Sequence, residues 1–378
     1  MTFGEKKRTA GAVLAAAFGA ALLAFVPAWA WACEDPPPEL EKRGSTVVIP
    51  VLFYSPETRW GGGIGGIVTF QMTNPAPHAA RGRPSSVSFI ATYTQNKQYE
   101  LSVKPELYLA GDSLIVTGNL SWRKTPSKFF GVGNDVPASG EEAFTPRVFS
   151  FEASAAKRIW KIRSVFAGLT YFYDRYALVE LDPAGRLTEG TIPGSGGGVM
   201  SGAGAVIKWD DRDNTFYPRA GNFIQLSAVA CGSLFGSDFT YTKVKADLRT
   251  FIPVANTHTL ALQAYLLSVF GTAPFTALPM FGTDNTMRGY YGGRFRDNHM
   301  AAFQAEYRLP LFWKLSLAGF AGAGRVAPRL SELGFSGFKG VAGWGLRFKV
   351  TPEGATLRLD FGYGKGTSGM YFTAGEAF

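Results

Sequence analysis

Histidine, cysteine and serine are the residue types that could supply a metal site or a nucleophile in this chain. Its 378 residues include only three histidines and two cysteines. His78, His258 and His299 lie far apart and have no cysteines or clustered acids at the spacing of metal ligands. Cys33 and Cys231 are too few for a framework of disulfides. We therefore expect neither a metal nor a cofactor.

One short motif resembles a catalytic one. Gly111-Asp112-Ser113-Leu114 matches the nucleophile block of a hydrolase family, but glycine and aspartate are also typical turn residues. No Asp-x-x-His follows that could supply a base. The glycine-rich stretch 194–198 lacks the strand–loop–helix context of a phosphate site. We predict that the protein is not an enzyme, with a lipid hydrolase that uses Ser113 as the remaining alternative.

The composition restricts the classes of protein to which this chain can belong. Aromatic residues make up 14% of the chain, charged residues 18%, and 46 residues are glycine. A disordered chain would have few aromatic residues, and a helical membrane protein would have apolar runs of about 20 residues. Lysine and arginine are scattered despite the net charge of +9, which argues against nucleic-acid binding. An all-β chain fits best.

Apolar and polar residues alternate in many segments, as they do in strands with two different faces. In segment 99–109, for example, Leu101 and Val103 alternate with Glu100, Ser102 and Lys104. The sixteen predicted strands span residues 46–54, 60–71, 84–96, 98–110, 113–124, 146–158, 160–175, 199–210, 220–231, 239–252, 257–270, 300–311, 315–326, 340–350, 355–365 and 370–378. A soluble β-sandwich would show the same alternation.

The links between these strands favour a membrane barrel over a sandwich. Most links after even-numbered strands are short, whereas the links 125–145, 176–198, 271–299 and 327–339 after odd-numbered strands are long. Short turns at one end and long loops at the other are typical of outer-membrane barrels. We therefore predict a single transmembrane antiparallel β-barrel of about sixteen strands with both termini in the periplasm. The link 72–83 is an exception.

The N-terminus has the pattern of an export signal. Lys6, Lys7 and Arg8 precede an apolar run over 10–26, and small residues follow at the spacing of a cleavage site. Cleavage after Ala30 or Ala32 fits; the second would expose Cys33 as in a lipoprotein, and an uncleaved membrane anchor is a further alternative. We predict a signal peptide over 1–30, a periplasmic tail over 31–45, too short for a domain, and a barrel over 46–378.

Several motifs in a fixed order resemble the BamA/TamA outer-membrane protein family, the bacterial surface antigen barrel. The resemblance covers residues 54–378. A loop motif consists of Met287, Arg288, Gly289 and Tyr290, and a turn motif includes Asp211, Arg212, Asp213, Asn214, Pro218 and Gly221. The strand 305–311, the opening 54–58 and the closing 375–378 are also similar to the family's.

The resemblance implies roles for some of these residues. In the family, the signature loop folds into the barrel and its arginine pairs with acids on the inner wall, which implies Glu306 as a partner of Arg288. The family's second acid is missing, because Gly322 stands in its place, and Arg288 then pairs more weakly or with another inner acid such as Asp360. Independently solvated charges remain the alternative. Phe378 matches the aromatic C-terminal signal read by the assembly machinery.

The resemblance also implies a function. Family members insert proteins into the outer membrane or move polypeptides across it, and are thought to use a weak seam between the first and last strands. The implied partners are outer-membrane lipid and lipopolysaccharide, the barrel assembly machinery for the protein's own insertion, and unfolded barrel clients or a separate periplasmic partner. The family's N-terminal periplasmic domains are not expected here. A passive pore is the main alternative.

Overall fold

The computed structural model describes residues 44–378 except 56–58, 73–81, 160–163, 256 and 335. The predicted signal peptide, all but two residues of the predicted tail, and His78 lie outside the described residues. Among the described residues, no helix has the length and apolar character needed to cross a membrane.

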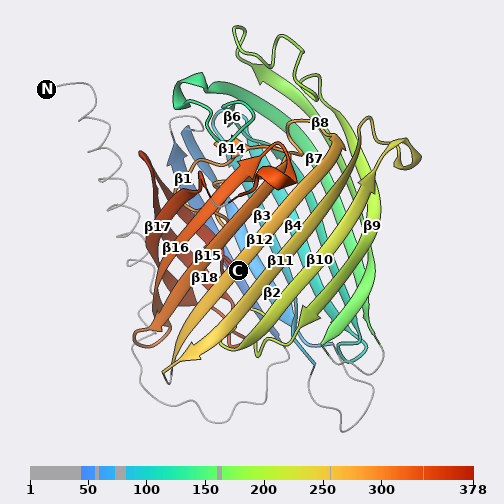
Figure 1. Ribbon diagram of the computed structural model, residues 1–378. Helices are drawn as coiled ribbons and strands as arrows, with labels where there is room; N and C mark the ends of the chain where they lie inside the picture. The colour runs from blue at the N-terminus through green and yellow to red at the C-terminus, as the bar shows by residue number, and fades with distance from the viewer. Residues whose placement is uncertain (1–43, 56–58, 73–81, 160–163, 256, 335) are drawn as a thin grey trace, which may run out of the picture. The chain divides into compact units, whose positions relative to one another are not determined.

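Sixteen long strands form one antiparallel sheet that curves into a barrel in the described part of the chain (Figure 1). They are β1 (Gly44–Ser55), β2 (Arg59–Phe70), β3 (Ser85–Thr94), β4 (Tyr99–Leu109), β5 (Leu114–Lys124), β7 (Glu142–Arg158), β8 (Val165–Leu181), β9 (Gly198–Asp210), β10 (Gly221–Cys231), β11 (Thr240–Val254), β12 (His258–Thr272), β15 (His299–Pro310), β16 (Leu315–Ala327), β17 (Lys339–Lys349), β18 (Thr356–Gly364) and β19 (Thr367–Ala374). The predicted all-β barrel of about sixteen strands is confirmed.

Three short strands and three short helices lie in the links. The strands are β6 (Ser127–Phe129), β13 (Met280–Phe281) and β14 (Phe295–Arg296), and the 3₁₀ helices are η2 (Ala138–Gly140), η3 (Ser233–Phe235) and η4 (Leu330–Glu332). β6 pairs with β7, and β13 pairs with β14 inside one link.

Each long strand pairs with the next one along the chain, with β5 followed by β7 and β12 by β15. Among the described residues no ladder of hydrogen bonds joins β1 to β19, so β1 pairs only with β2 and β19 only with β18. In the part of the wall that the structure describes, the barrel therefore has a seam with two unpaired edges.

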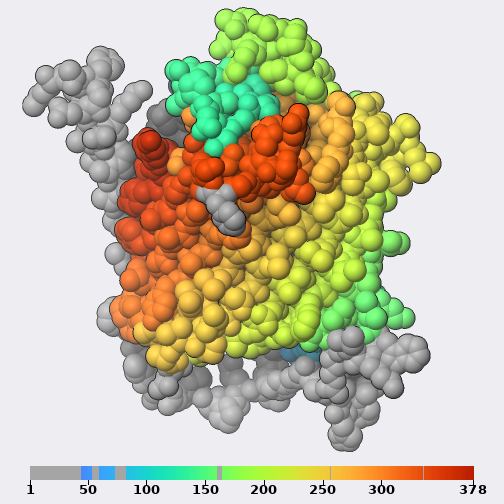
Figure 2. All heavy atoms as spheres, viewed as in Figure 1, coloured from blue at the N-terminus to red at the C-terminus, as the bar shows by residue number. Residues whose placement is uncertain are grey.

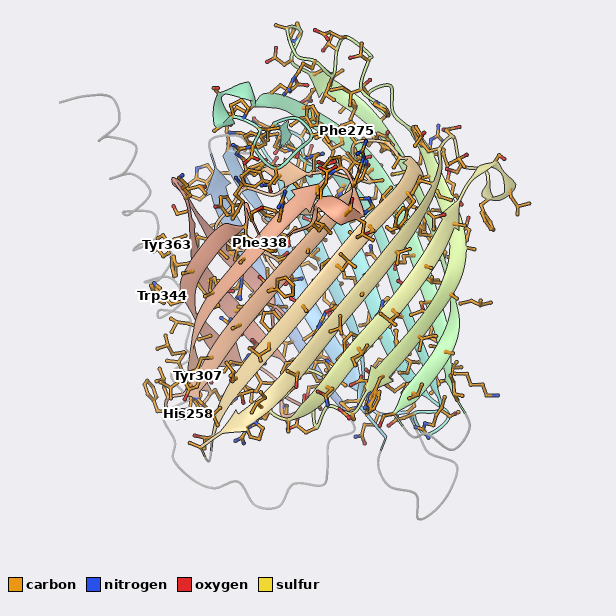
Figure 3. The ribbon with its side chains drawn as sticks, viewed as in Figure 1. His258, Phe275, Tyr307, Phe338, Trp344 and Tyr363 are labelled. Atoms are coloured by element: carbon orange, nitrogen blue, oxygen red, sulfur yellow. The ribbon has the colours of Figure 1, made fainter. Side chains whose placement is uncertain are left out.

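Side chains alternate between the outside and the inside of the wall. Trp344 and Tyr363 lie on the outer side in Figure 3 and are 45% and 52% exposed, whereas Arg347 and Asp360, on the same strands, are 1% and 0% exposed. A wall whose outer face is apolar needs a lipid environment. The inner face carries the polar residues that build the candidate site.

The two ends of the barrel differ. One end, here called the short-turn end, has short turns between neighbouring strands. These turns join β4 to β5, β11 to β12, β15 to β16 and β17 to β18. At the long-loop end, the links after β5, β8, β12 and β16 are longer. Figure 2 shows the links after β5 and β8, in teal and light green, standing above the wall at that end. The predicted orientation, with the short-turn end in the periplasm, stays a prediction.

Predicted boundaries of three strands are wrong. β7 begins at Glu142 rather than 146 and β8 ends at Leu181 rather than 175, because a bulge between Thr145 and Pro146 lets the hairpin continue past the proline. The last strand was predicted to reach 378 but ends at Ala374. Residues 375–378 turn into the barrel instead, for reasons given below.

Candidate functional site: an arginine cluster inside the barrel

The link between β12 and β15, residues 273–298, is here called the signature loop, and it folds into the barrel. Met287 and Arg288 are 0% and 1% exposed. The loop's apolar residues pack with inward side chains of the wall in a cluster of Phe281, Met287, Tyr290, Phe295, Met300, Ala302, Val326 and Val341. Burial of these side chains holds the loop against β15, β16 and β17.

Gly289 brings the loop backbone directly against β18. Its φ is +123°, and an added Cβ would lie 2.7 Å from the backbone nitrogen of Tyr363. A Cβ on Gly362 would in turn lie 2.6 Å from the carbonyl carbon of Arg288. The Gly289 N–H donates to the Tyr371 hydroxyl at 2.8 Å. Both glycines are therefore needed for the close approach of loop and strand.

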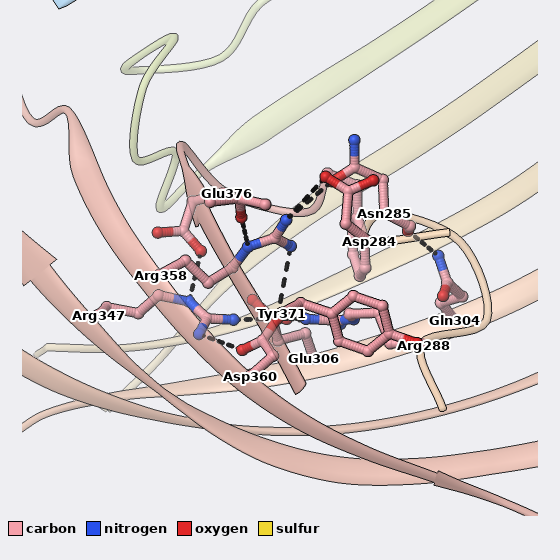
Figure 4. A network of polar contacts seen from close by, with 12 residues as sticks. Asp284, Asn285, Arg288, Gln304, Glu306, Arg347, Arg358, Asp360, Tyr371 and Glu376 are labelled. Carbon is pink, nitrogen blue, oxygen red and sulfur yellow. Dashed lines mark hydrogen bonds and ion pairs between the residues drawn. The ribbon is translucent and has the colours of Figure 1, made fainter. Parts of the chain in front are cut away.

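The Arg288 guanidinium lies between two carboxylates (Figure 4). Its Nη2 is 2.8 Å from Oε2 of Glu306 on β15, and its Nη1 is 2.5 Å from Oδ2 of Asp360 on β18. It also lies 3.6 Å from the centre of the Phe320 ring. A planar fork suits such a site because it binds two acids and stacks on a ring at once.

Three further arginines complete the cluster. Arg347 contacts Glu306 at 3.0 Å and Asp360 at 2.5 Å. Arg308 contacts Glu306 at 2.9 Å. Arg358 lies 3.5 Å from Asp360 and donates to the Asn285 side chain at 2.9 Å. Each carboxylate thus faces three guanidinium groups.

The cluster is stable only as a whole. All four arginines are at most 1% exposed, and Glu306 and Asp360 are 0% exposed. Moving a charge out of water costs several kcal/mol, so a buried ion must be compensated by partners with good geometry. The signature loop is therefore held by ionic contacts that cannot be lost one at a time without penalty.

The turn motif crosses the short-turn end between β9 and β10. The Asp213 carboxylate accepts from the N–H of Arg219 at 2.9 Å and of Ala220 at 3.2 Å, which fixes the turn. Asn214 Nδ2 donates to the carbonyl of Glu353, on the β17–β18 turn, at 2.8 Å. The Asp211 carboxylate accepts from the N–H of Asn222 at 2.5 Å. The β9–β10 turn therefore contacts the β17–β18 turn.

Two residues of the turn motif act close to the wall. Arg212 binds the Asp210 carboxylate at 2.8 and 2.9 Å, and Arg83 binds the same group at 2.7 Å. Burial lowers the pKa of Arg212, but its bonds to Asp210 outweigh burial and the net shift of that pKa is upward. The Pro218 carbonyl accepts from Arg308 at 3.4 Å, so the turn contacts the arginine cluster.

Phe378 lies inside the barrel and is 3% exposed. It packs with Phe251 of β11 and Ala261 of β12, and its carbonyl oxygen accepts from Arg308 Nη2 at 2.8 Å. The structure thus brings Phe378, Pro218, Glu306 and the signature loop to one cluster through Arg308.

The other sequence candidates lie elsewhere. Ser113 Oγ donates to the Ala110 carbonyl at 2.8 Å, and the Asp112 carboxylate accepts from the N–H of Arg83 at 2.9 Å. His258 bonds the Tyr307 hydroxyl at 2.6 Å on the outer wall. No set of three or more His, Cys, Asp or Glu residues that could hold a metal ion occurs in the described part of the chain.

The sequence did not assign partners to Arg308, Arg347, Arg358 or Glu376. For the three arginines a signal existed, because each alternates with outward apolar residues and so belongs to the inner face. Glu376 gave no such signal, because it continues the set of positions that contains the outward Met370 and Phe372. Their mutual contacts depend on strand register. Asp360, for example, lies opposite Gly345, two residues from Arg347.

These features define an outer-membrane type of β-barrel with a loop anchored inside it. Residues 80–378 match the model of the Omp85 superfamily domain. The chain belongs to the Omp85 superfamily, and the family predicted from the motifs is confirmed.

Three solved structures have a similar fold at low identity. BamA from Haemophilus ducreyi lacking POTRA domains 1–3 has 13% identity and a TM-score of 0.53, over 89% of this chain and 70% of that one. CdiB from Escherichia coli has 11% identity and a TM-score of 0.55, over 88% of this chain and 62% of that one. CdiB from Acinetobacter baumannii has 11% identity and a TM-score of 0.51, over 86% of this chain and 56% of that one. Comparison with curated proteins gives no significant match.

The chain spans less than two thirds of the length of both CdiB structures and 70% of the BamA structure. At these identities the likeness shows the fold.

Proposed function

We propose that this protein is an outer-membrane barrel that assists the insertion of other β-barrel proteins. The observation that carries this proposal is the seam, where β1 and β19 each have an unpaired edge among the described residues. Unpaired N–H and C=O groups are a template on which an incoming strand can pair.

Pro50 shows which backbone groups of β1 face the free edge. Proline lacks an N–H and is tolerated in a strand where that position faces away from the ladder. Because Pro50 lies within the continuous β1–β2 register, its side of the backbone faces the free edge. Residues alternate, so Val48 and Leu52 also present their N–H and C=O groups to the free edge.

Contacts inside the barrel favour insertion over two alternatives that need an open lumen, a passive pore and a channel for polypeptides. The turn 211–220 contacts Arg308, and residues 375–378 contact Arg308 and Arg347. The signature loop reaches both arginines through Glu306. These inward-folded segments narrow the lumen that a passive pore or a passing polypeptide would use. Strand pairing at the seam leaves them in place.

A lipid hydrolase has less support. The Ser113 hydroxyl is used in a turn bond to Ala110, and the adjacent Asp112 carboxylate holds a neighbouring link through the Arg83 N–H. These are the contacts of a structural turn.

The location and partners belong to the same proposal. The protein would reach the outer membrane after cleavage of residues 1–30, contact lipid and lipopolysaccharide through its apolar outer wall, and be inserted by the barrel assembly machinery, which would read Phe378. Its clients would be unfolded barrel chains, delivered alone or by a separate periplasmic partner.

The test is the folding time of a small barrel in liposomes with and without the purified protein. Folding should be several-fold faster in its presence. Val48→Pro should remove most of this acceleration, because it deletes a donor of the free edge and leaves the β1–β2 ladder intact. Val48→Thr, which keeps the N–H, is the matched control. Equal acceleration by both variants would refute templating at β1.

A further inference from the structure

The β15–β16 turn at the short-turn end carries three exposed apolar residues, here called the apolar tip. Leu311, Phe312 and Trp313 are 45%, 70% and 62% exposed, although small and polar residues dominate most turns. Trp313 has a φ of +53°, a backbone conformation that is costly for a bulky residue. Its ring packs edge-on against Phe348 on the outer face of β17, with 5.5 Å between the ring centres. The apolar tip therefore continues the apolar outer wall.

Next to the apolar tip lies a pocket of about 450 Å³, here called the rim pocket. It is formed between the β9–β10, β15–β16 and β17–β18 turns, and its volume suits a small ligand. The three residues of the apolar tip line it together with Arg219 of the β9–β10 turn, Lys314 of the β15–β16 turn and Lys349 at the end of β17. The rim pocket thus combines apolar surface with cations.

The net charge of the rim pocket is positive. Four cationic and two acidic residues line it. One of the cations, Arg347, is already compensated by the acids of the arginine cluster and by Glu376. The other three cations outnumber the two acids, Asp213 and Glu353. An anion would therefore be attracted to this pocket.

The two lysines are the cations best placed to hold an anion. The Lys349 N–H donates to the Lys314 carbonyl at 2.9 Å, so their backbones are adjacent. Within the described part of the chain neither ammonium forms an ion pair with a carboxylate, and Lys314 Nζ lies 5.5 Å from the centre of the Trp313 ring. Two neighbouring like charges repel each other, and an anion bound between them removes this repulsion.

The position of the rim pocket along the wall indicates which anion it suits. Aromatic side chains of a membrane barrel gather where the hydrocarbon region meets the headgroups. Trp313 and Phe348 belong to such a belt, as does Tyr307 of β15, which lies near the same end of the outer wall in Figure 3. Lys314 and Lys349 directly follow members of this belt in the sequence. A phospholipid would satisfy both features, because it has a phosphate for the lysines and acyl chains for the apolar tip.

We propose that the rim pocket binds the headgroup of an anionic phospholipid. The phosphate lies between the ammonium groups of Lys314 and Lys349, and the acyl chains run along the outer wall beside Trp313 and Phe348. Because Arg347 belongs to both the rim pocket and the arginine cluster, the bound lipid also stabilises the interior that holds the signature loop. This proposal goes beyond the proposed function, since it requires a barrel in a membrane but not its activity in insertion.

The site is tested by native mass spectrometry of the purified protein in detergent, titrated with phosphatidylglycerol or with phosphatidylcholine of the same acyl chains. The fraction of protein that carries one lipid gives the affinity for each lipid, and the parent should prefer phosphatidylglycerol. The double variant Lys314→Gln, Lys349→Gln should lose roughly fivefold in affinity for phosphatidylglycerol per lysine, the usual contribution of a basic residue at an anionic membrane surface. Its affinity for phosphatidylcholine should stay close to that of the parent.

The matched control is the double variant Lys97→Gln, Lys365→Gln. Both lysines are exposed and lie in the β3–β4 and β18–β19 links at the long-loop end, so the same charge is removed far from the rim pocket. Both affinities should be unchanged. Trp313→Ser should weaken both lipids alike, because it removes contact with the acyl chains rather than with the headgroup. Only protein that migrates as a folded barrel on unheated gels is used.

Equal affinity of the parent for the two lipids, or an unchanged affinity for phosphatidylglycerol in Lys314→Gln, Lys349→Gln, would overturn the headgroup site. Displacement of phosphatidylglycerol by soluble glycerol 3-phosphate would assign the rim pocket to a soluble phosphate compound and overturn the lipid as its ligand. These outcomes are separate from the liposome folding assay, since a lipid can bind whether or not client folding is accelerated.

Discussion

At the scale of single residues, Glu306 is the most constrained group of the site, because it contacts Arg288, Arg308 and Arg347 while fully buried. Glu306→Gln keeps the volume but leaves these guanidinium groups undercompensated, which we expect to cost about 3–5 kcal/mol. The signature loop should then be cut by trypsin in folded barrels. Glu332→Gln should leave the loop resistant, and resistance in both variants would contradict an ionic anchor.

The family resemblance implied Glu306 as a partner of Arg288, with Asp360 as an alternative for the missing second acid, and alternation places both acids on the inner face. It could not show that Arg347 joins them. That contact depends on the register that sets Asp360 opposite Gly345, where a side chain would collide with the carboxylate. Alternation along one strand gives the face of a residue, whereas its neighbours come from pairings between strands distant in sequence.

At the scale of elements, the order of the sixteen strands followed from alternation and link length, but the end of β19 did not. The strand was predicted to reach Phe378, whereas the left-handed φ of Gly375 and the buried partners of Glu376 end it at Ala374. Local patterns predict a strand well, while its last residues depend on contacts across the barrel.

The turn between β9 and β10 gives a prediction at the same scale. Gly221 has a φ of +98°, and an added Cβ would lie 2.5 Å from the Asp211 carbonyl oxygen. Gly221→Ala should therefore lower the free energy of unfolding by about 1–3 kcal/mol, the usual cost of such strain. The measurement is urea unfolding in lipid vesicles. Gly232→Ala is the matched control, because Gly232 has an extended φ of 177° and no atom lies within 4 Å of an added Cβ. Equal losses of unfolding free energy in the two variants would show that strain at Gly221 does not cause the loss.

At the scale of the whole molecule, three segments that are far apart in the sequence meet at Arg308 and Arg347 inside one wall. The signature loop reaches them through Glu306, the β9–β10 turn reaches Arg308 through Pro218, and residues 375–378 reach both through Glu376. The three segments are therefore held by one set of charges, so loss of one contact should weaken the others.

This arrangement predicts the electrical behaviour of the barrel in planar bilayers. The unchanged protein should show low, intermittent conductance, because the signature loop, anchored inside the barrel through Arg288, narrows the path of ions. Arg288→Gln should increase the time spent in open states, since it removes the contacts of the loop to both Glu306 and Asp360. Leu234→Ser, at a side chain 88% exposed in the β10–β11 link, should behave like the parent. A large, steady conductance of the parent would favour the passive pore, whereas a closed parent and a leaky Arg288→Gln variant would show that the loop anchored by the arginine cluster closes the barrel.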